Sequence, residues 1–239
     1  MTTTIKGQPT SAEVRERLAA EGRPVLVAFS GGKDAIATEL ALQDAGVTTQ
    51  LAYLYYIPGR EPGRTLAFVE QGLQDLEQRL GKPIHRYPHP SLYRWLNNLV
   101  FQPPERCAVI EAAQLPEVTY EELWGFIRED LGLAPDTWVA DGVRAADSIV
   151  RRASFSKHGV MKARSRKVSP IADWLVREVR DRIAAAGISL PVDYEWFGRS
   201  FDGIDYRFLE PISRHAPDDF ARILDWFPLA DLELYRHGL

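Results

Sequence analysis

The sequence predicts an α/β protein with a doubly wound, mostly parallel sheet and a C-terminal helical appendage. Short apolar runs of strand length alternate with longer runs in which apolar residues recur at helical spacing. Glycine follows several of the longer runs, at the position where helices end. Strands that alternate with helices are joined by right-handed crossovers, so neighbouring strands are expected to run parallel.

The composition is that of an ordinary globular protein, with 45% hydrophobic and 26% charged residues among 239. A net charge of −4 gives no overall attraction for nucleic acid. Cys107 is the single cysteine, which excludes internal disulfides and a cysteine-ligated iron–sulfur cluster within one chain. Without a long apolar run or an apolar N-terminal signal, we expect a cytoplasmic protein that makes no membrane contact.

The alternation of strands and helices predicts one α/β domain over residues 1–190 and an aromatic-rich extension with helices over 191–239. Thr10 and Glu13 form a capping box before the first helix, and Thr119 and Glu122 form another. Helices are predicted at 11–21, 33–45, 65–80, 91–101, 120–131, 144–151, 174–186, 217–227 and 229–236. Strands are predicted at 25–29, 49–56, 83–87 and 137–141, with a strand or an extended lid at 204–209.

The stretch at 25–34 is the centre of the functional prediction. A buried strand is followed by Ser30, Gly31 and Gly32, and then by a helix that begins at Lys33. Glycine allows the backbone to approach a ligand, and the free N–H groups of a first helical turn attract anions. The stretch therefore predicts a phosphate site, with a plain glycine turn as the alternative.

The string SGGKDA at 30–35 resembles the SGGxDS loop of the PP-loop ATP pyrophosphatases, in the form found in the phosphoadenosine phosphosulfate reductase branch. The resemblance implies a HUP-type fold and an adenine nucleotide whose phosphates lie on this loop. Ala35 replaces the usual serine, which removes one donor. The residues implied to bind the nucleotide are Ala28, Phe29, Ser30, Gly31, Gly32, Lys33, Asp34, Tyr53, Gly142, Arg144 and Arg151.

A second motif, GVRAADSIVR at 142–151, resembles the GxRxx(E/D)SxxR segment of the same reductases. Helical spacing is expected to bring Arg144, either Asp147 or Ser148, and Arg151 onto one face. An arginine presents a forked set of donors to anionic oxygens. The alternative is an exposed helix with internal salt bridges. A third motif, KVSPIADW at 167–174, resembles another segment of that family, in which Asp173 braces and Trp174 packs.

Residues 151–167 carry seven basic side chains and no acid. We expect a mobile loop that binds a polyanionic second substrate, a nucleotide or a nucleic acid, with a solvated loop as the alternative. The residues predicted to bind that substrate are Arg152, Lys157, Lys162, Arg166 and Lys167. Arg60 and Arg64 follow the second strand, where they could contact phosphate or only solvent.

The histidines and the C-terminal charges leave further alternatives open. His85 and His89 lack a third metal ligand in sequence, so no metal-binding residues are predicted. The C-terminal charges, which either face the site or form their own ion-pair cluster, are Arg199, Asp202, Asp205 and Arg207.

Three functions fit these motifs. The first is ATP-dependent adenylation, in which Lys33, Asp34, Arg144 and Asp147 act on ATP, with Mg²⁺, as a transferase or hydrolase that modifies a small molecule or nucleic acid. The second is a non-catalytic nucleotide-binding subunit of a modification complex. The protein partner expected for the chain is such a complex or a further copy of the chain in a homo-oligomer. The third is a sulfonucleotide reductase that uses an external thiol, because no cysteine follows Cys107 where such reductases carry one.

Overall fold

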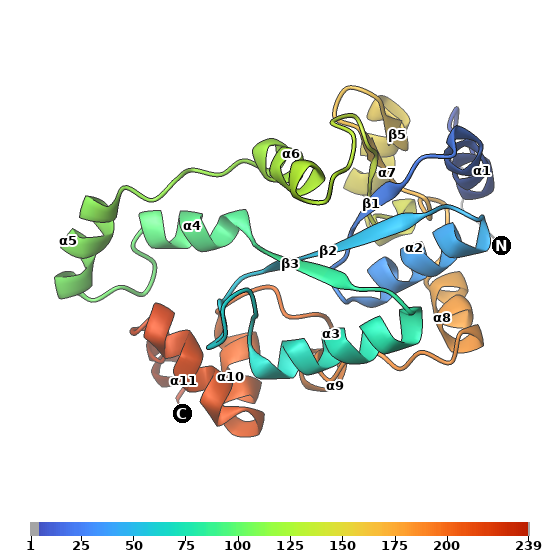
Figure 1. Cartoon of the computed structure of the whole chain (residues 1–239). Coiled ribbons are helices and arrows are strands. Elements are labelled where there is room, and N and C mark those ends of the chain that lie inside the picture. Colours follow the sequence, from blue (N-terminus) through green and yellow to red (C-terminus); the bar gives the residue numbers. More distant parts are fainter. Residues whose placement is uncertain (1–4, 239) are drawn as a thin grey trace. The chain divides into compact units, whose positions relative to one another are not determined.

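The computed structural model describes residues 5–238 of the chain (Figure 1). In chain order its elements are α1 (Ser11–Glu21), β1 (Val25–Ala28), α2 (Lys33–Asp44), β2 (Thr49–Tyr55), α3 (Ala67–Leu80), β3 (Ile84–Pro88), α4 (Pro90–Asn97), α5 (Pro104–Ala113), α6 (Tyr120–Asp130), β4 (Val139–Ala140), η1 (Ala145–Asp147), α7 (Ile149–His158), β5 (Met161–Lys162), β6 (Lys167–Val168), α8 (Val176–Ala185), α9 (Asp193–Phe197), α10 (Tyr206–His215), α11 (Pro217–Trp226) and α12 (Leu232–Arg236). Within the described residues, no helix combines the length and the apolar character that a membrane span needs.

The strands form a six-stranded sheet in the order β3-β2-β1-β4-β6-β5. Strand β1 pairs in parallel with β2 and with β4, and β4 pairs in parallel with β6, whereas β5 is antiparallel to β6. The strand order reverses between β1 and β4, because β1 leads outward to β2 and β3 while the later strands extend the other edge. This arrangement confirms the predicted α/β class with a mostly parallel sheet. In such sheets, ligands bind outside the carboxyl ends of the strands at the reversal.

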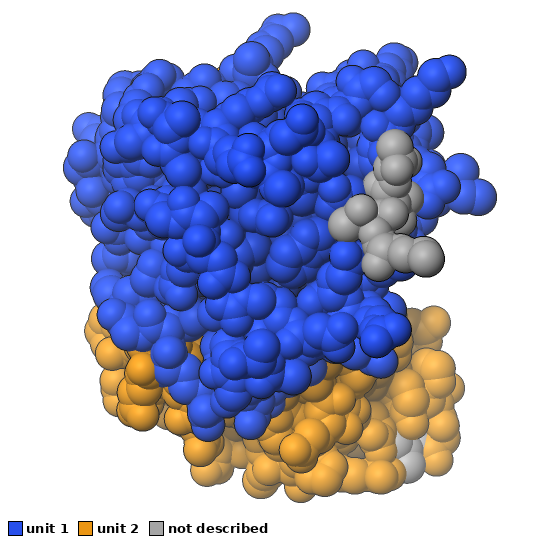
Figure 2. Space-filling model, turned by 90° about the vertical axis from the view of Figure 1, so that its right-hand side faces the viewer, with its two compact units in different colours: residues 1–53, 79–85, 124–190 blue, residues 54–78, 86–123, 191–239 orange. Residues whose placement is uncertain are grey.

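The chain divides into two compact units (Figure 2). Unit 1 comprises residues 1–53, 79–85 and 124–190, and unit 2 comprises residues 54–78, 86–123 and 191–239. Each unit therefore combines segments that are far apart in sequence. The predicted division into domains 1–190 and 191–239 stays a prediction.

Unit 1 has an apolar centre that holds β1 and α2 in place. Val25, Leu26 and Val27 are at most 1% exposed, as expected for a central strand of a parallel sheet that is covered on both faces. Helix α2 is buried continuously from Ala35 to Leu42, and it packs against α8. The turn between β1 and α2 is therefore fixed at both ends.

The KVSPIADW segment braces α1. The Ser11 N–H donates to Asp173 Oδ2 at 2.9 Å, and the Asp173 N–H donates to Ser11 Oγ at 3.3 Å. Arg15 donates to the Pro170 carbonyl at 2.8 Å, and its guanidinium lies 5.4 Å from the ring centre of Trp174. The expected bracing and packing roles of Asp173 and Trp174 are therefore confirmed.

Unit 2 has an aromatic core. The rings of Phe197 and Phe208 meet edge-on at 5.1 Å, and those of Phe201 and Phe208 meet at 5.5 Å. Phe68 from α3 packs edge-on against Phe201 at 5.9 Å. These contacts join α3, α9 and α10, so the C-terminal segment and residues 54–78 share one core.

The structure contradicts the predicted continuous helix over 144–151. A 3₁₀ turn, η1, is followed by Ser148 in an extended conformation (φ −165°, ψ 158°), and α7 begins only at Ile149. The Ser148 hydroxyl accepts a hydrogen bond from the Arg151 N–H at 3.1 Å. A serine that caps a helix has an extended backbone, so Arg144 and Arg151 lie on different elements and not on one helical face.

Two further predictions were wrong. Residues 151–167 are not one loop, because α7 and the hairpin of β5 and β6 occupy most of them. Residues 204–209 form neither a strand nor an extended lid, because α10 begins at Tyr206. Asp205 caps that helix by accepting a hydrogen bond from the Arg207 N–H at 3.0 Å. Helices α5 and α9 were not predicted.

Candidate functional site

The site begins at the carboxyl end of β1. Phe29 is buried, and its N–H continues the sheet by donating to the Ala52 carbonyl at 2.8 Å. The chain then turns through Ser30 and Gly31, and Gly31 has a φ of +70°, which a residue with a side chain rarely adopts. Gly32 is extended and precedes the first residue of α2. The strand thus leads directly to a helix N-terminus through a turn in which Ser30 is exposed and Gly31 and Gly32 are buried.

The N-terminus of α2 lacks a side-chain cap among the described residues, because Gly32 at the cap position has no side chain to offer. The Ser30 hydroxyl lies 3.4 Å from the Gly32 nitrogen, which places a further polar group at the turn. The first-turn N–H groups and the helix dipole together favour negative charge at this place.

Gly142, two residues after the end of β4, lies against the same helical turn. A Cβ atom on Gly142 would lie 2.8 Å from the carbonyl carbon of Asp34 and 2.9 Å from its oxygen, so that a side chain does not fit. The carboxyl ends of β1 and β4 therefore meet at the point where the strand order reverses. Gly142, which the resemblance implied to bind the nucleotide, thus lies close to the protein's own backbone.

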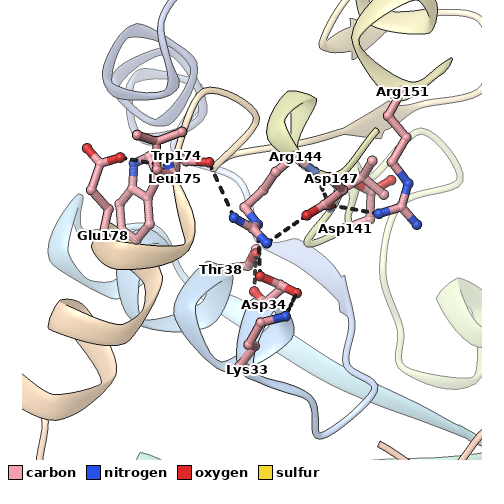
Figure 3. Close-up of polar contacts among 11 residues, drawn as sticks. Lys33, Asp34, Thr38, Asp141, Arg144, Asp147, Arg151, Trp174, Leu175 and Glu178 are labelled. Carbon is pink, nitrogen blue, oxygen red and sulfur yellow. Dashed lines mark hydrogen bonds and ion pairs between the residues drawn. The ribbon is translucent and has the colours of Figure 1, made fainter. Parts of the chain in front are cut away.

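Five charged side chains form a continuous chain across this meeting point (Figure 3). Lys33 Nζ lies 2.7 Å from Asp34 Oδ2, and Arg144 Nε lies 2.9 Å from Asp34 Oδ1. Arg144 Nη2 lies 2.6 Å from Asp147 Oδ1, and Arg151 Nη1 lies 2.7 Å from Asp147 Oδ2. We call these five residues the charge chain. Its charges alternate in sign and leave one net positive charge.

Arg144 is the centre of the charge chain, with only 5% of its side chain exposed. Its Nη1 also donates to the Trp174 carbonyl at 3.5 Å, which links the site to the KVSPIADW segment. Arg144 Nε and Asp34 Oδ1 face each other without the alignment of a hydrogen bond, and neither atom has another hydrogen-bond partner among the described residues. A buried donor and acceptor in this state are unusual in a native protein, and they mark a place where a ligand or water could bind.

Asp141 is a site residue to which the sequence assigned no role. It directly follows β4, and its Oδ1 accepts hydrogen bonds from Ser169 Oγ at 2.6 Å and from the Val143 N–H at 3.2 Å. Burial of the carboxyl group raises the pKa of Asp141, although these hydrogen bonds and nearby Lys162 and Lys167 oppose the rise. Its position next to Gly142 at a strand end was the signal that could have found it.

The predicted second-substrate residues do not form one loop. Arg152 and Lys157 are exposed on α7, whereas Lys162 and Lys167 lie directly opposite each other on β5 and β6. The Arg166 guanidinium lies 3.9 Å from the ring centre of Trp138, and Arg166 pairs with Asp136 at 3.6 Å. The Arg166 side chain thus binds neighbouring residues of the protein itself.

The remaining predicted residues lie in the sheet or in ion pairs with neighbouring residues. Ala28 ends β1, and Tyr53 is 4% exposed on β2. The C-terminal charges form pairs among themselves, Arg199 with Asp202 and Arg207 with Asp205. No group of three or more potential metal ligands exists among residues 5–238.

No protein-family model matches the chain, and no curated protein matches it. Among solved structures, it is similar to the crystal structure of NAD+ synthetase from Burkholderia pseudomallei, with a TM-score of 0.42 and 14% sequence identity over 91% of this chain and 87% of that chain. A likeness of this degree carries no argument about this chain.

Proposed function

We propose that the chain binds ATP at the carboxyl ends of β1 and β4 and activates a second substrate by adenylation, with release of pyrophosphate. The observation that carries this proposal is the uncapped N-terminus of α2 at the strand-order reversal, with Lys33 and Arg144 both at ion-pair distance from Asp34 in its first turn. Phosphate groups bind at this kind of helix terminus in α/β sheets.

The residues present fit a phosphate group. The turn of Ser30, Gly31 and Gly32 offers a hydroxyl and backbone without side chains, and Arg144 adds a buried guanidinium that is ion-paired with Asp34 and Asp147. The net positive charge of the charge chain also favours an anion. We propose that the pyrophosphate part of ATP lies on this turn, with Arg151 at the outer end of the site.

A magnesium ion fits only as a companion of the nucleotide. Mg²⁺ commonly binds one or two carboxylates together with phosphate oxygens and water. Asp34 and Asp147 supply two carboxylates, and the described residues contain no larger ligand group. Mg²⁺ bound there would neutralise phosphate charge and polarise the phosphoryl oxygens.

The proposed reaction needs no covalent nucleophile from the protein. An oxygen or another nucleophile of the second substrate attacks the α-phosphorus, the bond to the β-phosphate bridging oxygen breaks, and pyrophosphate leaves. Lys33 and Arg144 stabilise the charge that develops on the phosphoryl oxygens. The fixed turn between β1 and α2 orients the nucleotide, which is a substantial part of catalysis for such a transfer.

For the second substrate we propose a polyanion, a nucleotide or a nucleic acid. The exposed side chains of Arg152 and Lys157 on α7 support this proposal, because α7 begins directly beside the charge chain. These cations would contact phosphates and set the position of the substrate without reading its sequence.

Calorimetry with ATP, with and without Mg²⁺, tests the nucleotide site, and pyrophosphate release with candidate acceptors tests the reaction. Lys33→Ala is expected to weaken ATP binding about tenfold, since it removes a charge-assisted contact. Lys6→Ala removes the same charge from an exposed turn and is expected to leave binding unchanged. No heat at millimolar ATP would refute the nucleotide site.

Two other outcomes identify the alternative functions. ATP binding without pyrophosphate release for any acceptor would support a nucleotide-binding subunit of a modification complex. Sulfite release from phosphoadenosine phosphosulfate with an added thiol would support a sulfonucleotide reductase. In that case the thiol would come from outside, since Cys107 is half-buried on α5 and its Sγ lies 3.4 Å from the Pro103 carbonyl.

A further inference from the structure

Unit 2 contains a cavity of about 460 Å³. Its walls are the loop at 57–66, the first turns of α3 and the first turns of α11. The loop follows the carboxyl end of β2 and contains Arg60 and Arg64. All residues that line this cavity belong to unit 2.

Two charged side chains of α11 hold the walls together. Asp219 is 7% exposed, and it accepts hydrogen bonds from the N–H groups of Ala67 at 2.7 Å and Phe68 at 2.9 Å. Arg222 Nε donates to the Pro58 carbonyl at 2.9 Å, and its Nη2 donates to the Gly59 carbonyl at 2.6 Å. One helix thus fixes both the loop and the start of α3.

The loop itself is closed by short-range contacts. The Gly59 N–H donates to the Arg64 carbonyl at 2.8 Å, and Thr65 Oγ1 donates to the Ile57 carbonyl at 2.8 Å. A Cβ atom on Gly59 would lie 2.1 Å from the Thr65 oxygen, so only glycine fits there. The cavity is therefore preformed, which lowers the cost of binding a small ligand.

The buried carboxylates in the walls are already balanced. Glu70 accepts hydrogen bonds from the Thr65 N–H at 2.9 Å, from Arg86 at 3.1 Å and from Arg64 at 3.2 Å. Asp219 occupies the N-terminus of α3, where a phosphate would otherwise be attracted. The cavity is therefore poorly suited to a simple phosphate.

The side chains that have no such commitment carry both signs of charge. Arg60, Glu61 and Asp218 line the cavity and are exposed, and so are the amide side chains of Gln71 and Gln74. Among the described residues, none of these five side chains has a hydrogen bond or an ion pair. Apart from Gly59 and Ala67, every residue that lines the cavity has a polar or charged side chain, so a ligand can be recognised by its charges and polar atoms.

We propose that this cavity binds a free α-amino acid, with the carboxylate at Arg60, the ammonium at Asp218 and polar side-chain atoms at Gln71 and Gln74. An α-amino acid carries both charges within a small volume, which matches a preformed, polar cavity with one uncommitted arginine and one uncommitted aspartate. This proposal does not depend on the ATP chemistry proposed for unit 1.

The test uses the full chain and ligand-observed NMR with each proteinogenic α-amino acid at millimolar concentration, followed by calorimetry for those that bind. At least one amino acid is expected to bind, and its N-acetyl and its amide derivatives are expected to bind about tenfold more weakly, because each lacks one charge. Arg60→Gln and Asp218→Asn are each expected to weaken binding by a similar factor. Both residues are exposed, so the fold should tolerate these changes.

Asp75→Asn is the matched control, because it removes a carboxylate from the exposed part of α3 outside the cavity lining. It is expected to leave amino-acid binding unchanged, and all three variants are expected to bind ATP as the original chain does. The proposal is overturned if no amino acid binds, or if both cavity variants bind one as tightly as the original chain. Loss of ATP binding in the Lys33→Ala variant alone would leave this test unaffected.

Discussion

Replacing Arg144 by methionine tests whether the charge chain holds the site together. The change keeps an unbranched apolar stem in a place where 5% of the side chain is exposed, and it removes the guanidinium from between Asp34 and Asp147. The two carboxylates lose partners at 2.9 Å and 2.6 Å, respectively. The size of the stability loss depends on how well other cations still compensate these two carboxylates.

Each carboxylate keeps a second cation. Lys33 remains 2.7 Å from Asp34, and Arg151 remains 2.7 Å from Asp147. Removal of one member of a fully buried pair costs about 3–5 kcal/mol because it leaves an uncompensated charge. Here the remaining cations and the partial exposure of both carboxylates reduce the cost, so we expect a loss of about 2 kcal/mol in the free energy of unfolding.

Urea unfolding followed by tryptophan fluorescence measures this loss, and thermal unfolding should show a decrease of about 4–8 °C in Tm. Arg177→Met is the control, since Arg177 is 89% exposed and pairs with Asp181 at 3.5 Å. Its effect should stay below about 0.5 kcal/mol. If Arg144→Met is as stable as the control, the charge chain does not stabilise unit 1, and the reasoning is refuted.

Three further predictions concern other contacts. In urea unfolding, Gly142→Ala should destabilise the chain by about 1–3 kcal/mol, and it should weaken ATP binding, because the new Cβ would lie 2.8 Å from the Asp34 backbone. Gly125→Ala in α6 is the control. Its Cβ would meet nothing within 4 Å, so this change should be neutral or stabilising. Burial lowers the pKa of His89 to about 4. The free energy of unfolding should therefore fall by about 3 kcal/mol as the pH decreases from about 6.5 to about 4, because the folded state resists protonation of this ring. The variant His89→Asn keeps an acceptor for the helix cap and should flatten that part of the curve of stability against pH. Asp219→Ala should cost about 1–2 kcal/mol in the same unfolding assay by uncapping α3, and an unchanged midpoint would contradict the capping role.

The role of His89 could be predicted from the sequence only in part. The sequence left open whether His89 was a metal ligand or a structural residue, and the absence of a third ligand in sequence argued against a metal. In the structure, His89 Nδ1 accepts the Ser91 N–H at 2.9 Å and caps α4. The ring also stacks on Tyr56 at 4.1 Å, a contact between segments that the sequence does not connect.

Local patterns predicted most elements because their causes are local. The capping box at Thr10 and Glu13, the apolar run at 25–28 and Gly46 after α2 all depend on residues within a few positions of one another. The errors at 144–151 and 204–209 have one cause. Ser148 and Asp205 act as helix caps, and spacing alone does not distinguish a cap from a residue within a helix or strand.

The sequence by itself determined the α/β class, the glycine turn at 30–32 and its place between a buried strand and a helix. Only the tertiary structure decided that β4 lies beside β1, that Gly142 touches Asp34, and that Arg144 links Asp34 to Asp147. It also decided that Asp219 and Arg222 hold a cavity around residues far away in the chain. The physical reason is that helix and turn formation depends on neighbouring residues, whereas strand order and ion pairing depend on contacts between residues far apart in sequence.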